Sequence, residues 1–225
     1  MKKIVLVLIV AAMSSMTAQT QSKPSVDVTG EGIVNVVPDQ VTINVRVENT
    51  GSNPKELKQI NDRTVSEVLQ FVTRMGIAEK YVKTDYVRLS KNYEYKTKTY
   101  NYVANQSLTI KLVDLEKYET LMNGLLETGI NRIDGLSFSS SQIDSLQSQA
   151  RKKAIENAKL KAEEYVSVLG QSIGKAIQIS EFQQIVNPGP MLRSAMAMDS
   201  EGAQKTLAPG EMQVSVRVNV SFELN

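Results

Sequence analysis

The sequence predicts an α+β fold built on a ferredoxin-like βαββαβ core at about residues 41–139, and two observations lead to this prediction. Several short segments alternate apolar with polar residues, which is typical of strands that bury one face. Two segments between them repeat apolar residues every three or four positions and carry helix start and stop signals. A flanking N-terminal strand, a long third helix at about 142–169 and C-terminal antiparallel strands complete the predicted architecture.

The first residues have the pattern of an export segment. Lys2 and Lys3 precede an apolar run at residues 4–13, and small and polar residues follow up to Ala18. The run is about half as long as the ~20 residues that a transmembrane helix needs. We therefore expect a signal peptide at 1–18, a polar leader at 19–25 and one domain at 26–225, which is divisible into two subdomains.

The predicted elements then follow in order. Interrupted alternation around Gly30 and Gly32 predicts the N-terminal strand, and residues 41–47 alternate cleanly as the next one. Asn53 can cap the first helix, with Pro54 at its first position and Gly76 as its stop. Strands are expected at about 82–90 and 106–113, joined by a long, polar, tyrosine-rich connection. A helix after Asp114 and a strand at about 133–138 complete the core.

The third helix is predicted at 142–169, with Ser141 as its cap and Gly170 as its stop. Its small mid-helix residues allow another element to approach closely. The predicted inward stripe consists of Ile143, Leu146, Ala150, Ala154, Ala158, Ala162, Tyr165 and Leu169. A strand is expected at 176–182, and three of the six prolines predict a partly mobile loop at 186–211. The unbroken alternation from Met212 to Leu224 is the strongest strand pattern in the chain.

Composition excludes several kinds of chemistry. The chain has no Cys and no His, so it holds no disulfide, no Cys/His zinc site and no His-based triad. Loss of residues 1–18 leaves 24 basic and 24 acidic side chains, so no net charge attracts nucleic acid. Gly30-Glu31-Gly32 resembles the start of a dinucleotide motif, but Asn35 stands at the third glycine position, and a close backbone approach is the better interpretation.

No residue stands out as catalytic, and we expect no cofactor. Capping explains Ser139-Ser140-Ser141, and Asp39 and Glu181 have the positions of solvated carboxylates. A hydrolase that uses Ser or a carboxylate is the enzymatic alternative. Three methionines in the predicted loop are weak Cu(I) candidates, since thioethers favour this ion, and a loose apolar contact patch is the competing interpretation. They are Met191, Met196 and Met198.

Tyrosine is concentrated in one place. Six of the eight tyrosines lie between Tyr81 and Tyr102, together with several lysines. Such a cluster could stack glycans or single strands of nucleic acid, or it could form a hairpin that packs on another subunit. We favour the interface, because tyrosine is enriched there and export argues against nucleic acid. The interface candidates are Tyr93, Tyr95, Tyr100 and Tyr102.

Ordered matches through the chain resemble the SIMPL-domain family of bacterial envelope proteins. The matching strings are Val28–Gly32, Pro38–Ile43, Gly76–Ile77, Val82–Thr84, Tyr93–Tyr95, Ala104–Ile110, Gly129–Phe138, Ala150–Ala162, Leu169–Gly170 and Ile179–Glu181. The chain departs from the pattern at Asn101-Tyr102, where the family often has Gly-Tyr.

The resemblance implies an α+β fold, no known cofactor and no established catalytic residue. It also implies a location in the periplasm or at the outer-membrane periphery of a Gram-negative-type bacterium, a large ring-like homo-oligomer and a link to envelope or oxidative stress tolerance. Our expectation is a non-catalytic exported protein that assembles with itself through exposed strand edges, including that of the long final strand, and through the tyrosine-rich hairpin. The alternative is a periplasmic binding module for a small ligand, a glycan or Cu(I).

Overall fold

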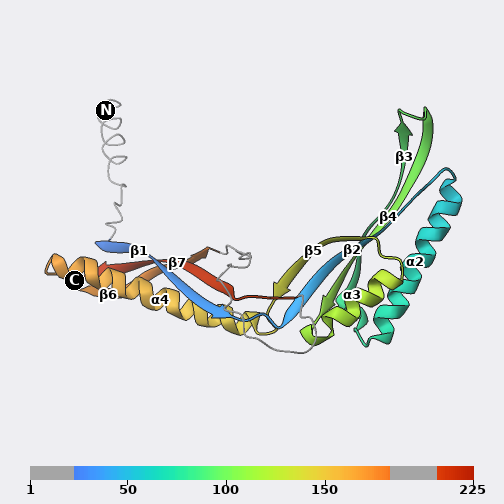
Figure 1. The fold of residues 1–225 in the computed structure, drawn as a ribbon. Helices are drawn as coiled ribbons and strands as arrows, with labels where there is room; N and C mark the ends of the chain where they lie inside the picture. Colours follow the sequence, from blue (N-terminus) through green and yellow to red (C-terminus); the bar gives the residue numbers. More distant parts are fainter. Residues whose placement is uncertain (1–22, 183–206) are drawn as a thin grey trace, which may run out of the picture.

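The chain forms two antiparallel sheets, one covered on one face by two helices and the other by a single helix, which lie end to end in an elongated molecule (Figure 1). The structure is a computed structural model that describes residues 23–182 and 207–225. A four-stranded unit is made by the middle of the chain. A three-stranded unit combines the two ends of the described chain, which are brought together by strand pairing.

The four-stranded unit has the predicted ferredoxin-like topology. Its elements are β2 (Gln40–Gly51), α2 (Pro54–Arg74), the 3-10 turn η1 (Glu79–Tyr81), β3 (Val82–Glu94), β4 (Thr99–Leu112), the 3-10 turn η2 (Leu115–Lys117), α3 (Tyr118–Glu127) and β5 (Arg132–Ser139). The strand order is β3-β4-β2-β5, and every neighbouring pair is antiparallel. The α+β class and the βαββαβ core at 41–139 are therefore confirmed.

Alternation in β2 builds the core of this unit. Val41, Ile43, Val45 and Val47 are fully buried against α2 and α3, and the residues between them face the open side of the sheet. The helix start is as predicted, because the Asn53 side chain accepts hydrogen bonds from the backbone N–H groups of Lys55 and Glu56. The four-stranded sheet thus has one helix-covered face and one uncovered polar face.

The three-stranded unit consists of β1 (Ser25–Val36), β7 (Met212–Leu224), β6 (Ile173–Phe182) and α4 (Ile143–Val168). Its strand order is β1-β7-β6, so β7 is hydrogen-bonded on both sides. The final strand was the strongest strand prediction and is confirmed as a strand. The prediction that it offers a docking edge is wrong, because its backbone groups are already paired with β1 and β6.

The helix α4 lies unusually close to β1. A Cβ atom added to Gly30 would overlap the carbonyl oxygen of Ala154 and lie 2.7 Å from the backbone nitrogen of Ala158. Gly32 meets Ala150 and Ala154 in the same way. The predicted close backbone approach and the predicted alanine contact are thus two sides of one interface.

Three details of the helix and strand predictions are wrong. Ser141 does not cap α4, since Gln142 is the residue at the cap position and no side chain accepts a cap hydrogen bond there, and the Ser141 hydroxyl donates to Asp39. The buried row of α4 ends with Val166, four residues after Ala162, and leaves Tyr165 and Leu169 exposed. The two strands beside the tyrosine-rich connection are longer than predicted, because β3 and β4 continue through it as a hairpin and leave only a short turn.

Two predicted segments lie outside the described residues. They are the signal peptide at 1–18 and the greater part of the loop at 186–211, including Met191, Met196 and Met198. The described part of that loop leads into β7, and its Leu207 packs against the core of the four-stranded unit.

Candidate interaction surface

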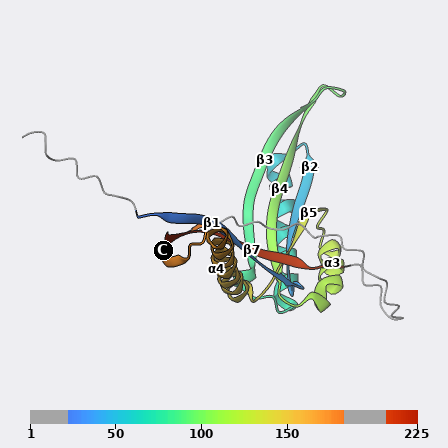
Figure 2. The ribbon, with the colours of Figure 1, turned by 90° about the vertical axis from the view of Figure 1, so that its left-hand side faces the viewer.

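The tyrosine-rich segment forms the end of the β3–β4 hairpin, which extends beyond the helices of its unit (Figures 1 and 2). We call residues 91–100 the hairpin tip. Direct pairs join Tyr93 with Tyr100 and Lys91 with Tyr102, so the strands stay in register almost to the turn. The turn itself contains Lys98 at a positive φ of 55° and a hydrogen bond between the hydroxyls of Thr97 and Thr99.

Three of the four predicted interface tyrosines come together at the tip. The Tyr93 ring lies 5.0 Å from the Tyr95 ring in an edge-on arrangement and 5.0 Å from the Tyr100 ring in a tilted one. Such ring pairs are favourable beyond the area they bury. The exposed fractions are nevertheless 42% for Tyr93, 84% for Tyr95 and 57% for Tyr100, and Tyr102 is half-buried. The rings therefore hold one another in place and still present apolar surface to solvent.

The apolar surface extends along the strand. Side chains alternate across a sheet, and the pairing places Val87, Leu89 and Tyr93 on the same face as the core residues Leu108 and Ile110. Val87 is 62% and Leu89 48% exposed, because α2 packs on β2 and β4 rather than on β3. The core-side face of the sheet thus continues outward as an uncovered apolar strip that ends in the tyrosines.

The hairpin tip is also basic. It carries Lys91, Lys96 and Lys98 against one acid, Glu94. The Lys91 ammonium group lies 4.0 Å from the centre of the Tyr100 ring, in a cation–π contact. The tip therefore combines aromatic surface with positive charge.

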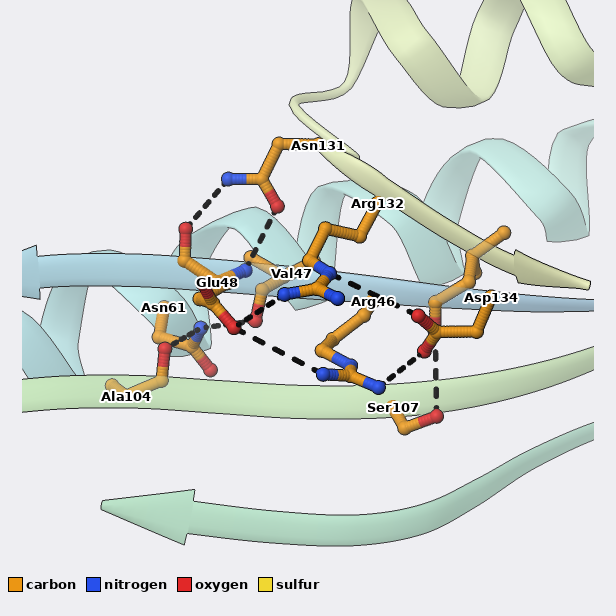
Figure 3. Close-up of polar contacts among 10 residues, drawn as sticks. Arg46, Val47, Glu48, Asn61, Ala104, Ser107, Asn131, Arg132 and Asp134 are labelled. Carbon is orange, nitrogen blue, oxygen red and sulfur yellow. Dashed lines mark hydrogen bonds and ion pairs between the residues drawn. The ribbon is translucent and has the colours of Figure 1, made fainter. Parts of the chain in front are cut away.

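The opposite face of the same sheet is closed by charge pairs (Figure 3). Arg46 Nη2 donates to Asp134 Oδ2 at 2.6 Å, and Arg132 lies 3.5 Å from Glu48 Oε2 and 3.8 Å from Asp134 Oδ1. The Arg46 guanidinium also lies 5.7 Å from the centre of the Tyr86 ring. These two arginines and two carboxylates pair with each other, so the cluster carries no net charge.

Asp39 and Ser141 join the two units. The carboxylate of Asp39 accepts hydrogen bonds from the backbone N–H and from the hydroxyl of Ser141, which lies in the connection between β5 and α4. The hydrogen bond from the Ser141 hydroxyl lowers the pKa of Asp39 below its ordinary value of 3.8. The interpretation of Asp39 as a merely solvated carboxylate was therefore incomplete.

Glu181 is likewise engaged. Its two carboxylate oxygens accept from Nε and Nη2 of Arg151 at 2.6 and 3.1 Å, which ties β6 to α4. The same hydrogen bonds lower the pKa of Glu181. Like Asp39, this carboxylate has a structural partner.

Sequence reasoning missed a row of side chains on α4 that covers the free edge of β1. Lys153 Nζ donates to the carbonyl of Ile33 at 3.2 Å, and Lys161 Nζ donates to that of Thr29 at 2.9 Å. Between them, Asn157 Oδ1 accepts from the N–H of Glu31 at 3.1 Å. The signal was the four-residue spacing of these polar residues beside the alanine stripe, which places both rows along one side of the helix.

Neither a metal-binding cluster nor a membrane-spanning helix is found in the described ranges 23–182 and 207–225. They contain no cluster of three or more carboxylates that could hold a metal ion. No helix within them is both long and apolar enough to cross a membrane.

A polar hollow of about 330 Å³ lies on the outer face of the three-stranded sheet. Its polar lining residues are Asp27, Thr29, Gln178, Ser180, Asn219 and Ser221. Inside it, the Thr29 hydroxyl donates to Asn219 Oδ1 at 2.8 Å. The hollow is open, and it offers hydroxyl and amide groups to a ligand.

Comparison with known proteins finds similarity over nearly the whole length of the chain. The family model SIMPL, described as a protein of unknown function (DUF541), matches residues 26–222. The uncharacterized protein YggE of Escherichia coli K12 is 27% identical over 229 residues, which cover 99% of this chain and 93% of YggE. The 26 kDa periplasmic immunogenic protein of Brucella melitensis is 25% identical, covering 95% of this chain and 90% of the relative. The human interleukin-1 receptor-associated kinase 1-binding protein 1 is 24% identical, with 94% and 81% coverage.

Proposed function

Because this chain belongs to the SIMPL family, we propose that it is a non-catalytic, exported protein of the cell envelope that assembles with itself through the hairpin tip. The observation that carries the assembly is the exposed, mutually packed cluster of Tyr93, Tyr95 and Tyr100 at the end of a projecting hairpin. Export is supported by the signal-peptide pattern at 1–18 and by the Brucella relative, whose name calls it periplasmic. Peripheral contact with the outer membrane belongs to the same proposal.

The exposed tyrosines of the hairpin tip favour contact with a protein partner. Full burial of a tyrosine removes roughly 150–250 Å² from water, and the three rings are already partly buried, so they supply roughly a third to a half of the roughly 800 Å² that a stable interface buries on each partner. Tyrosine is also among the residues enriched at the centre of interfaces. The ring contacts hold these side chains in place before binding, which lowers the conformational entropy that association costs.

Replacing the three rings tests the assembly. In the protein purified from the envelope fraction, we expect Tyr93→Thr, Tyr95→Thr and Tyr100→Thr together to reduce the mass measured by light scattering to that of a monomer. Threonine retains strand propensity, so the unfolding temperature should change little. Tyr86→Thr, on the other face of the same strand, is the matched control and should leave the mass unchanged. A wild-type protein that is monomeric across a dilution series would refute self-assembly.

Location and physiology need separate measurements. Fractionation of the producing cells should place the protein in the periplasmic fraction or with the outer membrane. A link to envelope or oxidative stress predicts that a deletion strain loses viability in peroxide and regains it with the wild-type chain. Equal survival of the deletion strain would remove the stress role and leave the assembly untouched.

The polar hollow favours a second candidate function, a binding module for a small polar ligand or glycan. Its hydroxyl and amide groups are the types that hydrogen-bond sugars. A ligand that binds there should raise the unfolding temperature of the wild type and not that of Asn219→Ala. N-acetylglucosamine oligosaccharides are the probe, and no shift at millimolar concentrations would count against this function. Cu(I) binding by the three methionines stays a prediction on residues outside the described ranges.

A further inference from the structure

A second exposed apolar surface lies at the C-terminal end of α4, which we call the α4 end (residues 163–170). Its three large apolar side chains are exposed, by 58% for Tyr165, 86% for Val168 and 73% for Leu169. The buried row of the helix passes through Ala162 and Val166, so these three lie beside it and nothing in the described chain covers them. Isolated apolar residues on a surface are ordinary, but three within five positions form a patch.

The α4 end is also acidic. Glu163 and Glu164 are exposed there, and the last turn of the helix contains no basic residue. The C-terminal end of a helix carries roughly half a negative charge from its aligned peptide groups, and basic side chains usually offset it. Lys159 forms an exposed ion pair with Glu163 at 3.8 Å from the preceding turn, which leaves Glu164 and the helix end to carry the negative charge. The patch therefore offers apolar surface combined with negative charge.

The hairpin tip offers the complementary combination. It carries three lysines and one glutamate around its tyrosines, so pairing two tips with each other would bring like charges together. Pairing a tip with an α4 end would instead bring lysines to glutamates and aromatic rings to aliphatic side chains. The two surfaces lie at opposite ends of the elongated molecule, so one copy cannot make this contact within itself (Figure 1).

We propose that the hairpin tip of one copy docks on the α4 end of a second copy, in a head-to-tail contact. This inference rests on the proposed self-assembly and names the surface that receives the tip. Tyr93, Tyr95 and Tyr100 pack on Val168 and Leu169, and Lys96 and Lys98 face Glu163 and Glu164. Such a contact joins two different patches, so each copy can dock its own hairpin tip on one neighbour and receive the tip of another neighbour at its α4 end.

A mixing experiment distinguishes this contact from a symmetric one. The tip variant is the Tyr93→Thr, Tyr95→Thr, Tyr100→Thr chain, and the end variant is Val168→Gln with Leu169→Gln. We expect each to be monomeric alone, with at least a tenfold weaker self-association than the wild type. Mixed one to one, they should form a dimer and nothing larger, because only one intact pair of surfaces remains. Leu126→Gln, at a leucine on α3 that is 53% exposed, is the control and should assemble normally.

Exchanging the charges tests which residues face each other. Lys96→Glu with Lys98→Glu should weaken assembly, as should Glu163→Lys with Glu164→Lys, and the chain that carries all four changes should recover the wild-type mass. Circular dichroism should show that every variant is folded. If the end variant assembles like the wild type and the tip variant does not, the head-to-tail contact is wrong and tip-mediated assembly stands. If neither variant changes the mass, both proposals are wrong.

Discussion

Two glycines in β1 determine how closely α4 lies on the three-stranded sheet. At Gly32, an added Cβ would overlap the carbonyl oxygen of Ala150 and lie 2.5 Å from the backbone nitrogen of Ala154. Both neighbours are backbone atoms of a regular helix, so neither can move aside alone. Relief requires α4 to shift, and that shift would loosen the contact along its whole alanine row.

Gly32→Ala should therefore lower the free energy of unfolding by about 2–3 kcal/mol, as overpacked sites do. Gly135→Ala is the control, because no atom lies within 4 Å of its added Cβ and its φ is not positive. That change should stay within about 0.5 kcal/mol of the wild type. Urea unfolding followed by circular dichroism measures both. Equal stability of the two variants would show that the close approach is not a constraint.

Asp39 gives the protein a pH dependence of known sign. The hydrogen bond from Ser141 lowers the pKa of Asp39 in the folded state. The ionised carboxylate therefore stabilises the folded protein at pH values above 3.8, its ordinary pKa, and this contribution is lost as the pH falls through the folded-state pKa. We expect Asp39→Asn to be less stable than the wild type at about pH 6. The difference should shrink below 3.8 and disappear in stronger acid. A constant difference across this range would show that the variant acts through packing and not through the charge.

For single residues, the sequence predicted the type of contact that a side chain makes but not the residue that it contacts. The glycines and the alanines each indicated a close approach, yet they are separated by more than 100 residues, and no local rule pairs them. Ser141 shows the limit in another way. Its position before a helix predicts a cap, in which its oxygen would accept from backbone N–H groups, but the fold brings Asp39 near and its hydroxyl donates to that carboxylate.

Among the elements, α4 does more than cover a sheet. Its flank of Lys153, Asn157 and Lys161 hydrogen-bonds the outer edge of β1, where unpaired backbone groups would otherwise accept a foreign strand. The other outer strands β3, β5 and β6 carry register shifts, which also disfavour pairing between edges. Assembly by simple strand addition is therefore opposed at several edges, which favours docking through side chains.

Hydrogen exchange tests this role of α4. Asn157→Ala removes the acceptor of the Glu31 N–H, and a neutral hydrogen bond contributes about 1 kcal/mol, so the Glu31 amide should exchange about fivefold faster. Alanine is the better helix former, so a general loss of helix cannot explain such a result. Lys152→Ala, on the solvent side of the same helix, should leave the Glu31 amide unchanged. An unaltered rate in Asn157→Ala would mean that another group protects this edge.

The strands show why some elements were predicted well and one was not. In β2 and β7 apolar and polar residues alternate because one face is buried, and that pattern is visible in the sequence. In the outer half of β3 and β4 both faces meet solvent, so polar residues and tyrosines mix and the pattern resembles a loop. Hydrogen bonding between the two strands maintains the extended conformation there. Such pairing does not require apolar and polar residues to alternate, so the sequence of each strand shows no period of two.

The four-stranded unit is continuous in sequence, and it is inserted into the three-stranded unit, whose β1 precedes it and whose α4, β6 and β7 follow it. Among the residues that the structure describes, 40–139 contain almost the entire core of the four-stranded unit, and Leu207 is the one partly buried contribution from outside. The three-stranded unit needs β1 from the start of the described chain and β7 from its end. The Asp39–Ser141 hydrogen bonds tie together the two connections where the units meet.

The fragment 37–141 should therefore fold by itself. It retains the Asp39–Ser141 contact, which holds its two ends together, and of the described core contacts it loses only the packing of Leu207, at a cost of about 1–2 kcal/mol. A single cooperative urea transition, followed by the near-ultraviolet signal of its tyrosines, would establish this. An unfolded fragment would show that the two units form one cooperative body.

The folded fragment also separates the two docking surfaces. It carries the hairpin tip and lacks α4, so a head-to-tail contact leaves it monomeric even at high concentration. Added in excess to the full-length chain, it should occupy free α4 ends, block further docking and lower the mean mass as its ratio rises. The fragment with the three tyrosines replaced by threonine is the control and should have no effect. If tips instead pair with one another, the fragment would form dimers by itself, and the direction of docking assigned to this molecule would be wrong.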